Sequence, residues 1–280
     1  MELGISFTGD IANKNKLPAY EGIKSVEHIS CSLLIISSFL VEGRIRRKKF
    51  QALPIEFNLV AQRKGSFEFL YEVILPTSAS IAIELGETIT AEFMIDFLKY
   101  IYQRLLGKKE TVENKEISKL EERHSGDVNA IVDAVESSIR QAHNIVNNGV
   151  LNIQIFSGDS PRDNIINFDS RSKAYLNDYI EDKSPRVKLF SISSFNANEG
   201  TGRAFDLQEK RTIPFNVSND FDEKSINFLI HSMHEYTKKR RLNQIVNSSI
   251  ALKYTCIMDR AGRVKKLTIQ KARKELNDLV

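Results

Sequence analysis

The chain opens with a strict alternation of apolar and polar positions. Leu3, Ile5 and Phe7 alternate with polar or small residues, which is the period of a half-buried strand. A longer apolar pattern at helical spacing follows over 19–41. It covers more than one face, which predicts a helix central to its domain. Gly43 is placed to end this helix as a left-handed cap.

Two further patterns complete the first third of the chain. Alternation over 55–59 and 67–73 predicts a hairpin whose turn is formed by 62–65, where Gly65 relieves the backbone. Apolar residues at helical spacing then predict a helix over 89–106. Together these elements predict a mixed α+β domain over residues 1–106.

The middle of the chain is more polar. Residues 107–122 are the most highly charged stretch, which indicates a linker or an exposed helical arm. A helix is predicted to begin near 124–127, with Ser125 or Asp127 as its cap, and to continue to about 146. We therefore expect a connector, charged linker plus helix, over residues 107–149.

The remainder predicts mainly strands. Alternating segments occupy 150–156, 187–195, 202–207, 212–217, 250–258 and 264–269, and one helix is predicted over 222–241. In this helix Ile226, Leu229, Ile230, Met233 and Tyr236 are expected to face inward. Several short strands with one helix predict a β-rich domain over 150–280, built as a small sheet or a partly open barrel. The fold class is α+β, with an N-terminal domain like an α/β sandwich, a helical connector and this β-rich domain.

Two features bear on the compartment. Cys31 and Cys256 are far apart and neither has a second cysteine nearby, which excludes zinc ribbons and disulfide frameworks and favours a reducing compartment. The most apolar window, 31–41, is shorter than the about 20 residues that a membrane helix needs and is interrupted by serines. We expect a cytoplasmic protein with no membrane insertion.

The net charge of +4 conceals an uneven distribution. Residues 1–106 sum to zero, 107–149 to −2 and 150–280 to +6, and 238–274 hold 12 basic residues against Asp259 alone. Such a surplus favours binding to a polyanion, because each phosphate contact adds salt-dependent affinity. The alternative is a solvated edge hairpin protected by its cations, together with cations that suit a helix C-terminus.

The polyanion-binding candidates form two runs. They are Arg44, Arg46, Arg47, Lys48 and Lys49 in the first, and Lys238, Lys239, Arg240, Arg241, Arg263, Lys265 and Lys266 in the second. For the first run a solvated loop is the alternative. No aromatic stacking pair of the kind that RNA-recognition motifs carry is evident in the sequence.

Catalytic and metal-binding patterns are not found. His231 and His234 share a helix face, but the sequence around them is not the HEXXH pattern of metalloproteases. A nuclease site built on Glu56 and Lys64 would need Lys64 to lie within a strand, and Gly65 argues for a turn there. With no phosphate-binding glycine loop and no triad, we predict no catalytic residue, no metal and no cofactor.

The motifs themselves support one resemblance. Its features include the start LGISFTGD, the Leu17-Pro18-Ala19-Tyr20 segment before the long helix and the late Ile213-Pro214-Phe215. The most telling part is the Gly65-Ser66-Phe67-Glu68-Phe69 run, which is followed about 25 residues later by the predicted helix from Phe93 to Leu106 that ends in Gly107. The chain resembles a group of largely uncharacterised bacterial proteins encoded among mobile and antiphage-defence genes. The resemblance implies a context and no reaction.

These observations lead to three functional hypotheses. The first is a non-enzymatic sensor or accessory subunit of a bacterial antiphage-defence system, which acts through contacts with a protein partner from the same operon. The second is a nucleic-acid-binding protein that uses the basic 238–274 surface, and the third is an unrecognised metal-dependent nuclease. A homo-oligomer is compatible with each of them.

Overall fold

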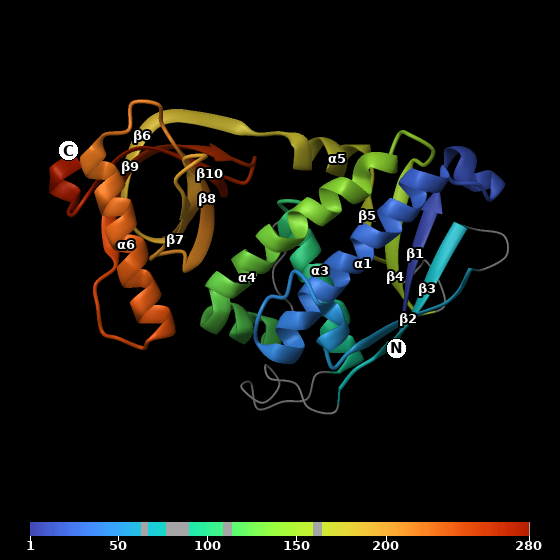
Figure 1. Ribbon diagram of the computed structural model, residues 1–280. Helices are drawn as coiled ribbons and strands as arrows, with labels where there is room; N and C mark the ends of the chain where they lie inside the picture. The colour runs from blue at the N-terminus through green and yellow to red at the C-terminus, as the bar shows by residue number, and fades with distance from the viewer. Residues whose placement is uncertain (63–66, 77–89, 109–113, 159–163, 280) are drawn as a thin grey trace. The chain divides into compact units, whose positions relative to one another are not determined.

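The computed structural model describes residues 1–62, 67–76, 90–108, 114–158 and 164–279 (Figure 1). The chain separates into two units, Met1–Asn177 and Asp178–Val280, named below the N-terminal and the C-terminal unit. Each unit has a hydrophobic core of its own. The fold class is α+β as predicted, and the second unit is a closed five-stranded barrel with one long helix.

The N-terminal sheet is antiparallel, with strand order β2-β3-β1-β4-β5. Its strands are β1 (Glu2–Thr8), β2 (Glu56–Gln62), β3 (Phe67–Ile74), β4 (Asn152–Ser157) and β5 (Asn164–Phe168). The expected first strand and the two strands of the hairpin are confirmed. Of the turn predicted over 62–65, Gln62 is the last residue of β2 and 63–65 lie outside the described residues. The strand predicted at 150–156 pairs with β1, so it belongs to this sheet and not to the β-rich domain.

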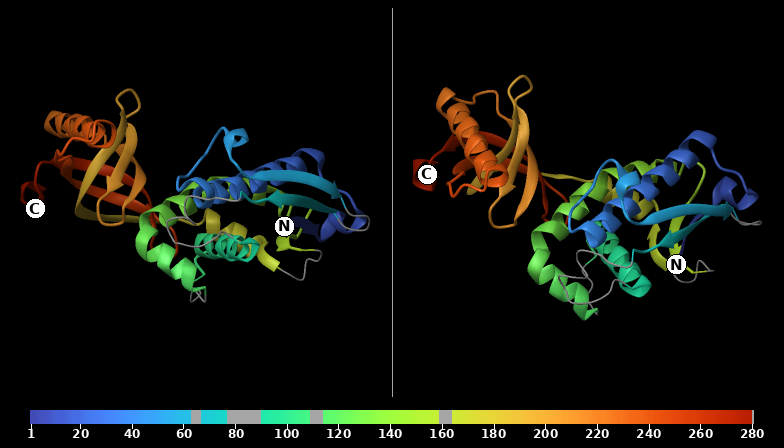
Figure 2. Two further views of the ribbon diagram at one scale, coloured as in Figure 1. Left: turned by 90° about the horizontal axis from the view of Figure 1, so that it is seen from below. Right: turned by 60° about the horizontal axis from the view of Figure 1, so that its bottom comes forward.

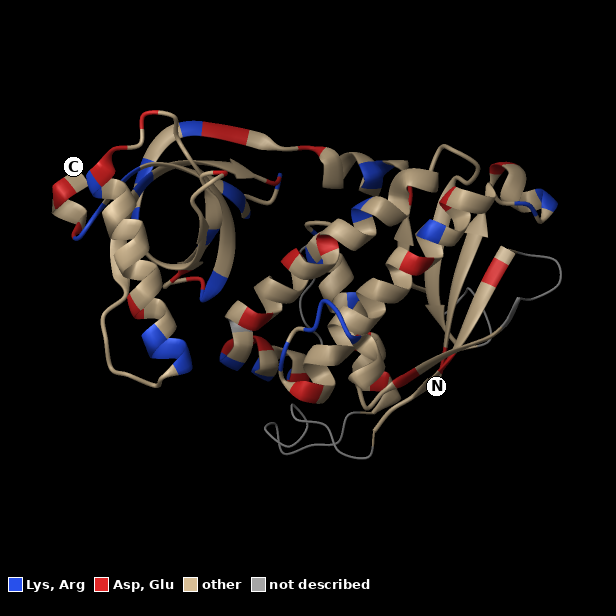
Figure 3. Ribbon diagram, viewed as in Figure 1, with Lys and Arg blue, Asp and Glu red and all other residues tan. Residues whose placement is uncertain are grey.

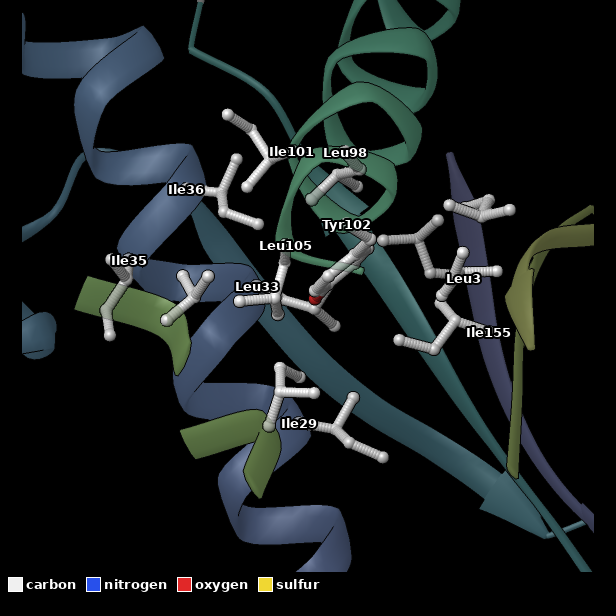
Figure 4. Packing of buried hydrophobic residues seen from close by; sticks show 14 of the residues in the cluster. Leu3, Ile29, Leu33, Ile35, Ile36, Leu98, Ile101, Tyr102, Leu105 and Ile155 are labelled. Carbon is white, nitrogen blue, oxygen red and sulfur yellow. The ribbon is translucent and has the colours of Figure 1, made fainter. Parts of the chain in front are cut away.

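Helices cover one face of this sheet (Figures 1 and 2). They are α1 (Ala19–Glu42), α3 (Ala91–Leu105), α4 (Lys115–Ala142) and the short α5 (Ser170–Asn177). Figure 4 shows side chains of α1 and α3 pointing toward one another and toward Leu3 and Ile155 of the sheet. Single-turn 3-10 helices occupy Asp10–Lys14, Phe50–Ala52 and His143–Ile145.

Helix α1 is the central helix of the unit, as its sequence predicts. It ends at Gly43, whose φ of 66° places it in the left-handed region while its amide donates to the Phe39 carbonyl at 2.8 Å. By length and composition α1 is the one described helix that could cross a membrane, but 61% of its most apolar window is buried within the unit. Its apolar surface therefore packs as that of a core helix in a globular domain.

The segment 107–149 contains the predicted helix, but the prediction that it connects two domains is wrong, because it lies within the N-terminal unit. From Lys115 onward this segment is α4, and its Ile117 and Leu120 are completely buried in the core. The helix starts at its cap Asn114, whose side chain accepts from the Glu116 amide at 3.0 Å; only a local kink at His124 marks the start predicted from sequence. The many charged residues of the segment obscured two apolar positions, Ile117 and Leu120, that anchor one face of the helix in the core.

The boundary between units therefore also differs from the predicted ones. It falls after Asn177, because β4, β5 and α5 complete the first sheet and its helical layer. By this division the N-terminal unit holds 21 basic and 23 acidic residues, and the C-terminal unit 19 and 13. The whole positive surplus of the chain lies in the barrel unit.

The barrel has strand order β6-β7-β8-β10-β9, closed between β9 and β6. Its elements are β6 (Ile180–Asn196), β7 (Thr201–Asp206), β8 (Arg211–Val217), α6 (Glu223–Arg241), β9 (Ser249–Met258), β10 (Val264–Arg273) and the 3-10 helix Leu276–Leu279. The third and fifth strands, β8 and β10, pair in parallel, and the other pairs are antiparallel. With α6 between the third and fourth strands, this is the topology of the OB-fold, a barrel on which unrelated proteins bind oligonucleotides or oligosaccharides.

Helix α6 packs on the barrel by a narrower face than predicted. Asp222 caps it by accepting from the Ser225 amide at 2.7 Å, and Leu229 is completely buried. Ile226 and Ile230 are exposed instead of inward. The Ile192 amide of β6 donates to Ser232 Oγ of α6 at 2.9 Å. A hydrogen bond therefore holds part of the helix against the barrel where apolar contacts were predicted.

Candidate nucleic-acid interface

The two runs of candidate cations lie in different units. Arg44 to Lys49 form the loop after α1, whereas Lys238 to Arg241 end α6 and Arg263, Lys265 and Lys266 belong to the β9–β10 hairpin. Figure 3 shows basic residues gathered at the end of α6. Each run is therefore considered by itself.

In the loop after α1, part of the positive charge is neutralised locally. Arg46 donates to both carboxylate oxygens of Glu42, at 2.8 and 2.6 Å, and Arg44 Nε donates to Glu42 Oε2 at 2.9 Å. The hydrogen bonds from Arg46 and Arg44 lower the pKa of Glu42 to about 2. This pairing holds the chain after the helix end, and Arg47, Lys48 and Lys49 remain exposed.

The β9–β10 turn uses its cations in the same way. Asp259 accepts from Arg263 Nε at 3.0 Å and lies 3.8 Å from Lys265 Nζ, and both basic side chains are largely buried. Arg260 pairs with Asp178. The formal +11 of residues 238–274 therefore overstates the charge that a ligand can meet, and Arg263 and Lys265 are structural.

The interior of the barrel is also closed to ligands. At one end Arg211 is completely buried and donates to Glu209 at 2.6 Å and to the Val264 carbonyl at 2.9 Å. Lys188 Nζ donates to the buried Asp206 at 2.7 Å. Elsewhere the interior is filled by apolar side chains, so a ligand must bind on the outside.

The outer side of β9 and β10 carries lysines without acidic partners. Strand register places Lys253 opposite Lys271 and Lys266 opposite Ile257. These positions face outward, because the alternate residues belong to the core. Among the described residues none of the three lysines makes an ion pair. Like charges opposite each other destabilise a sheet, so this arrangement is unexplained by folding alone.

The outward-facing positions of β9 and β10 are continued by outward-facing positions of β8 and β7. In the parallel pair Thr268 of β10 lies opposite Asn216 of β8, and Pro214 of β8 lies opposite Arg203 of β7. Arg203 is exposed and also lacks an ion pair within the described part of the chain. We name Lys253, Lys271, Lys266 and Arg203 the cationic strip.

An aromatic cluster adjoins the strip. Phe205 lies two positions beyond Arg203 on the same side of β7, and its ring centroid is 5.8 Å from that of Tyr236 on α6. The guanidinium of Arg240 lies 5.5 Å from the Phe205 ring and 5.7 Å from the Tyr236 ring. The cluster was not predicted from the sequence, because β8 and most of α6 lie between Phe205 and the other two residues. The sequence shows only that Arg203 and Phe205, two positions apart, lie on the same face of a strand.

The end of α6 adds further charge beside the cluster. Lys238 pairs with Glu235 at 3.0 Å, whereas Lys239 and Arg241 are exposed and make no ion pair to any described residue. Of the second candidate run, Lys239, Arg240, Arg241 and Lys266 are therefore available to a ligand. Arg203, Phe205 and Tyr236 join them as residues that only the fold brings together.

The described residues bring together none of the catalytic or metal-binding patterns considered in the sequence analysis. They contain no group of three or more His, Cys, Asp or Glu side chains that could hold a metal ion; His234 pairs with Glu235 and His231 is exposed. Burial raises the pKa of both thiols, Cys31 and Cys256, which disfavours the nucleophilic thiolate. Lys64, needed for the nuclease hypothesis, lies outside the described residues.

Comparison with known proteins follows the same two-unit division. A family described as a domain of unknown function, DUF7946, matches residues 3–177, and a family of unknown function, DUF7947, matches residues 184–273. No curated protein and no solved structure matches the chain. Because the first match covers more than half of its length, the protein belongs to the DUF7946 family.

Proposed function

We propose that the C-terminal unit binds single-stranded nucleic acid along the cationic strip and the Phe205–Tyr236–Arg240 cluster, without catalysing a reaction. The observation that carries the proposal is that cations without ion pairs among the described residues lie on the outer side of the barrel strands, next to Phe205 of β7, whose ring contacts Tyr236 of α6 at a tilt of 40°. OB-fold topology supports the assignment by analogy of fold only.

The chemistry of the two parts is complementary. Lysine and arginine contacts to phosphates supply affinity that does not depend on sequence, while bases that stack on aromatic rings contribute about 1–3 kcal/mol each. The Arg240 guanidinium offers a second planar surface for an unpaired base. Bases in a duplex are already stacked, so we expect single strands to bind in preference.

A protein-contact role in antiphage defence is the second candidate. Its structural support is the exposed apolar pair on α1, Tyr20 and Ile23, whose side chains are 66% and 69% exposed. Both cysteines are free thiols, which agrees with a cytoplasmic location. On this proposal the nucleic acid is the signal and a protein encoded in the same operon receives it.

Fluorescence anisotropy with labelled 20-nucleotide single strands and the matching duplex tests the first proposal. Phe205→Ala is expected to weaken single-strand binding roughly tenfold, and Lys266→Ala to weaken it at low salt. Lys224→Ala, an exposed lysine on the first turn of α6, is the matched control and should change little.

Two outcomes contradict the proposal. One is an absence of binding to any strand at low salt, and the other is equal affinity of wild type and the Phe205→Ala, Lys266→Ala double variant. The same incubations repeated with Mg²⁺ or Mn²⁺ address the nuclease hypothesis, since cleaved strands would replace binding by catalysis as the function.

A further inference from the structure

The barrel unit also carries a cavity whose lining shares no residue with the cationic strip. This cavity of about 610 Å³ lies between α6, the start of β9 and the C-terminal segment 274–277. Ligand pockets in proteins span about 300–1,000 Å³, so the cavity is large enough for a side chain together with flanking backbone.

Four of the eleven residues that line this cavity are large and apolar. They are Leu189 of β6, Phe228 of α6, Ile250 of β9 and Leu276. Leu276 is 39% exposed although it is a large apolar residue. Burying such a surface against an apolar group is favourable by about 25 cal/mol per Å². An apolar side chain in the cavity would therefore gain binding free energy from contact with these residues.

Polar groups at the cavity have hydrogen-bonding capacity to spare. Asn247 uses its Oδ1 to accept from the amide and hydroxyl of Ser249, at 2.9 and 2.7 Å, which leaves its Nδ2 to donate. The side chains of His231 and Asn277 make no hydrogen bond to any other described residue. Amide and imidazole groups both donate and accept, as peptide backbone requires.

The cavity differs from the cationic strip in its charge. Its lining contains one lysine, Lys274, and one carboxylate, Glu275, whose formal charges cancel. A phosphate-bearing ligand would meet the carboxylate as well as the ammonium, whereas a neutral ligand meets no such repulsion. The cavity chemistry thus fits a neutral, amide-bearing, apolar ligand.

We propose that this cavity binds a peptide segment of a partner protein, which inserts one large apolar side chain between Phe228 and Leu276 while its backbone amides pair with Asn247 and Asn277. The proposal does not rest on nucleic-acid binding, because the cavity and the cationic strip have no residue in common. It supplies the protein contact that an accessory subunit requires.

The test uses the full chain and five-residue probe peptides, acetylated and amidated, of the form Gly-Ser-X-Ser-Gly with X as Leu, Phe, Ala or Asp. Binding is measured by isothermal titration and located by amide chemical shifts. The Leu and Phe peptides are expected to bind at least tenfold tighter than the Ala peptide, since burying a Leu or Phe side chain contributes about 1.5–3 kcal/mol. Shifts are expected at 228–231 and 274–277.

Variants separate the cavity from the rest of the surface. Leu276→Ser and Asn277→Ala, both at exposed positions, should weaken the Leu peptide severalfold. Ile226→Ser, an exposed apolar residue of α6 that does not line the cavity, is the matched control and should leave it unchanged. Lys266→Ala should also leave peptide affinity unchanged, so failure of the nucleic-acid proposal does not affect this one.

Three results would overturn the inference. They are equal affinity for the Leu and Ala peptides, unchanged affinity in both cavity variants, and displacement of the Leu peptide by adenosine monophosphate or uridine at equal concentration. The last would reassign the cavity to a nucleoside.

Discussion

Serine hydroxyls join α1 to its neighbours in the N-terminal unit. Ser32 shares a hydrogen bond of 2.6 Å with the Tyr102 hydroxyl, Ser30 one of 2.8 Å with Tyr71, and Ser25 donates to the Ala142 carbonyl at 3.0 Å. Burial raises the pKa of both tyrosines. Ser32, which interrupts the apolar window 31–41, thus holds α1 to α3, while Ser30 and Ser25, which precede that window, hold it to β3 and α4.

His143 makes stability of the N-terminal unit depend on pH. It is completely buried, with Nδ1 2.7 Å from the Ile139 carbonyl and Nε2 2.8 Å from Ser172 Oγ, and burial lowers its pKa to about 4. The unfolded state, with a histidine pKa of about 6.5, binds more protons between these values. Stability is therefore full above pH 6.5 and falls as the pH approaches 4.

From pH 7 to pH 5 the loss is expected to be about 2 kcal/mol. Urea unfolding at both pH values, followed by hydrogen exchange of peptides from residues 1–177, measures it. His143→Gln should reduce the difference between the two pH values by this amount, and the half-buried His28→Gln should not. Equal pH dependence in wild type and His143→Gln would contradict the assignment.

The aromatic ring of Phe156 leaves no room for a side chain at Gly4. A Cβ at this position would lie 2.1 Å from Cζ of Phe156, which packs across β1 from β4. Gly4→Ala is expected to destabilise the N-terminal unit by about 1–3 kcal/mol, measured by urea unfolding. Phe156→Leu should recover part of that loss in the double variant; additive losses would mean that the two residues do not interact.

At the scale of elements, the β9–β10 hairpin carries two lysines opposite each other, which lowers its stability. Lys253 and Lys271 lie opposite each other on its outer side, and Thr255 lies opposite Thr268 between them and Lys266. A register shift after Ile269 brings the second lysine into this outward position. The hairpin would be more stable with opposite charges at this pair.

The variant Lys253→Glu tests whether this lysine lowers the stability of the unit and contributes to nucleic-acid binding. We expect it to stabilise the C-terminal unit by about 0.2–1 kcal/mol and to weaken single-strand binding, because a phosphate contact becomes a repulsion. Thermal unfolding and anisotropy measure the two effects on one sample. Lys224→Glu on α6 is the matched charge change, and an equal loss of binding there would show that only net charge matters.

At the scale of the whole molecule, the barrel unit holds the positive surplus while the N-terminal unit is slightly acidic. The two basic runs are correspondingly unlike. Arg44 and Arg46 serve the loop that follows α1, whereas the cations of the strip make no ion pair with described residues. We therefore expect the barrel unit to account for nucleic-acid affinity.

The salt dependence of binding checks this division of charge. For single strands log K falls with log salt by about 0.7 per phosphate contact. Changing Lys253, Lys266 and Lys271 together to Ala should reduce that slope by about 2. Changing Arg44, Lys48 and Lys49 to Ala removes three charges from the N-terminal unit and should leave the slope unaltered; a matching reduction would assign the contact to that loop.

The sequence by itself determined the elements with a clear period. The strand at Glu2–Thr8, the helix ended by Gly43 and the strands of the barrel unit follow from alternation and caps, since these depend on neighbours in the chain. It also determined that the basic surplus lies late in the chain. The second half of α4 was predicted, but its first turns, from Lys115, were assigned to a linker or exposed arm because Ile117 and Leu120 are few among many charges.

Only the tertiary structure decided where the charge is usable. Pairing of Arg263 and Lys265 with Asp259, and of Arg46 with Glu42, depends on distances that a charge sum does not contain. The Phe205–Tyr236–Arg240 cluster depends on how α6 crosses the barrel. Period and capping are local properties of the chain, whereas ion pairs, strand order and cavities arise from contacts between residues far apart in it.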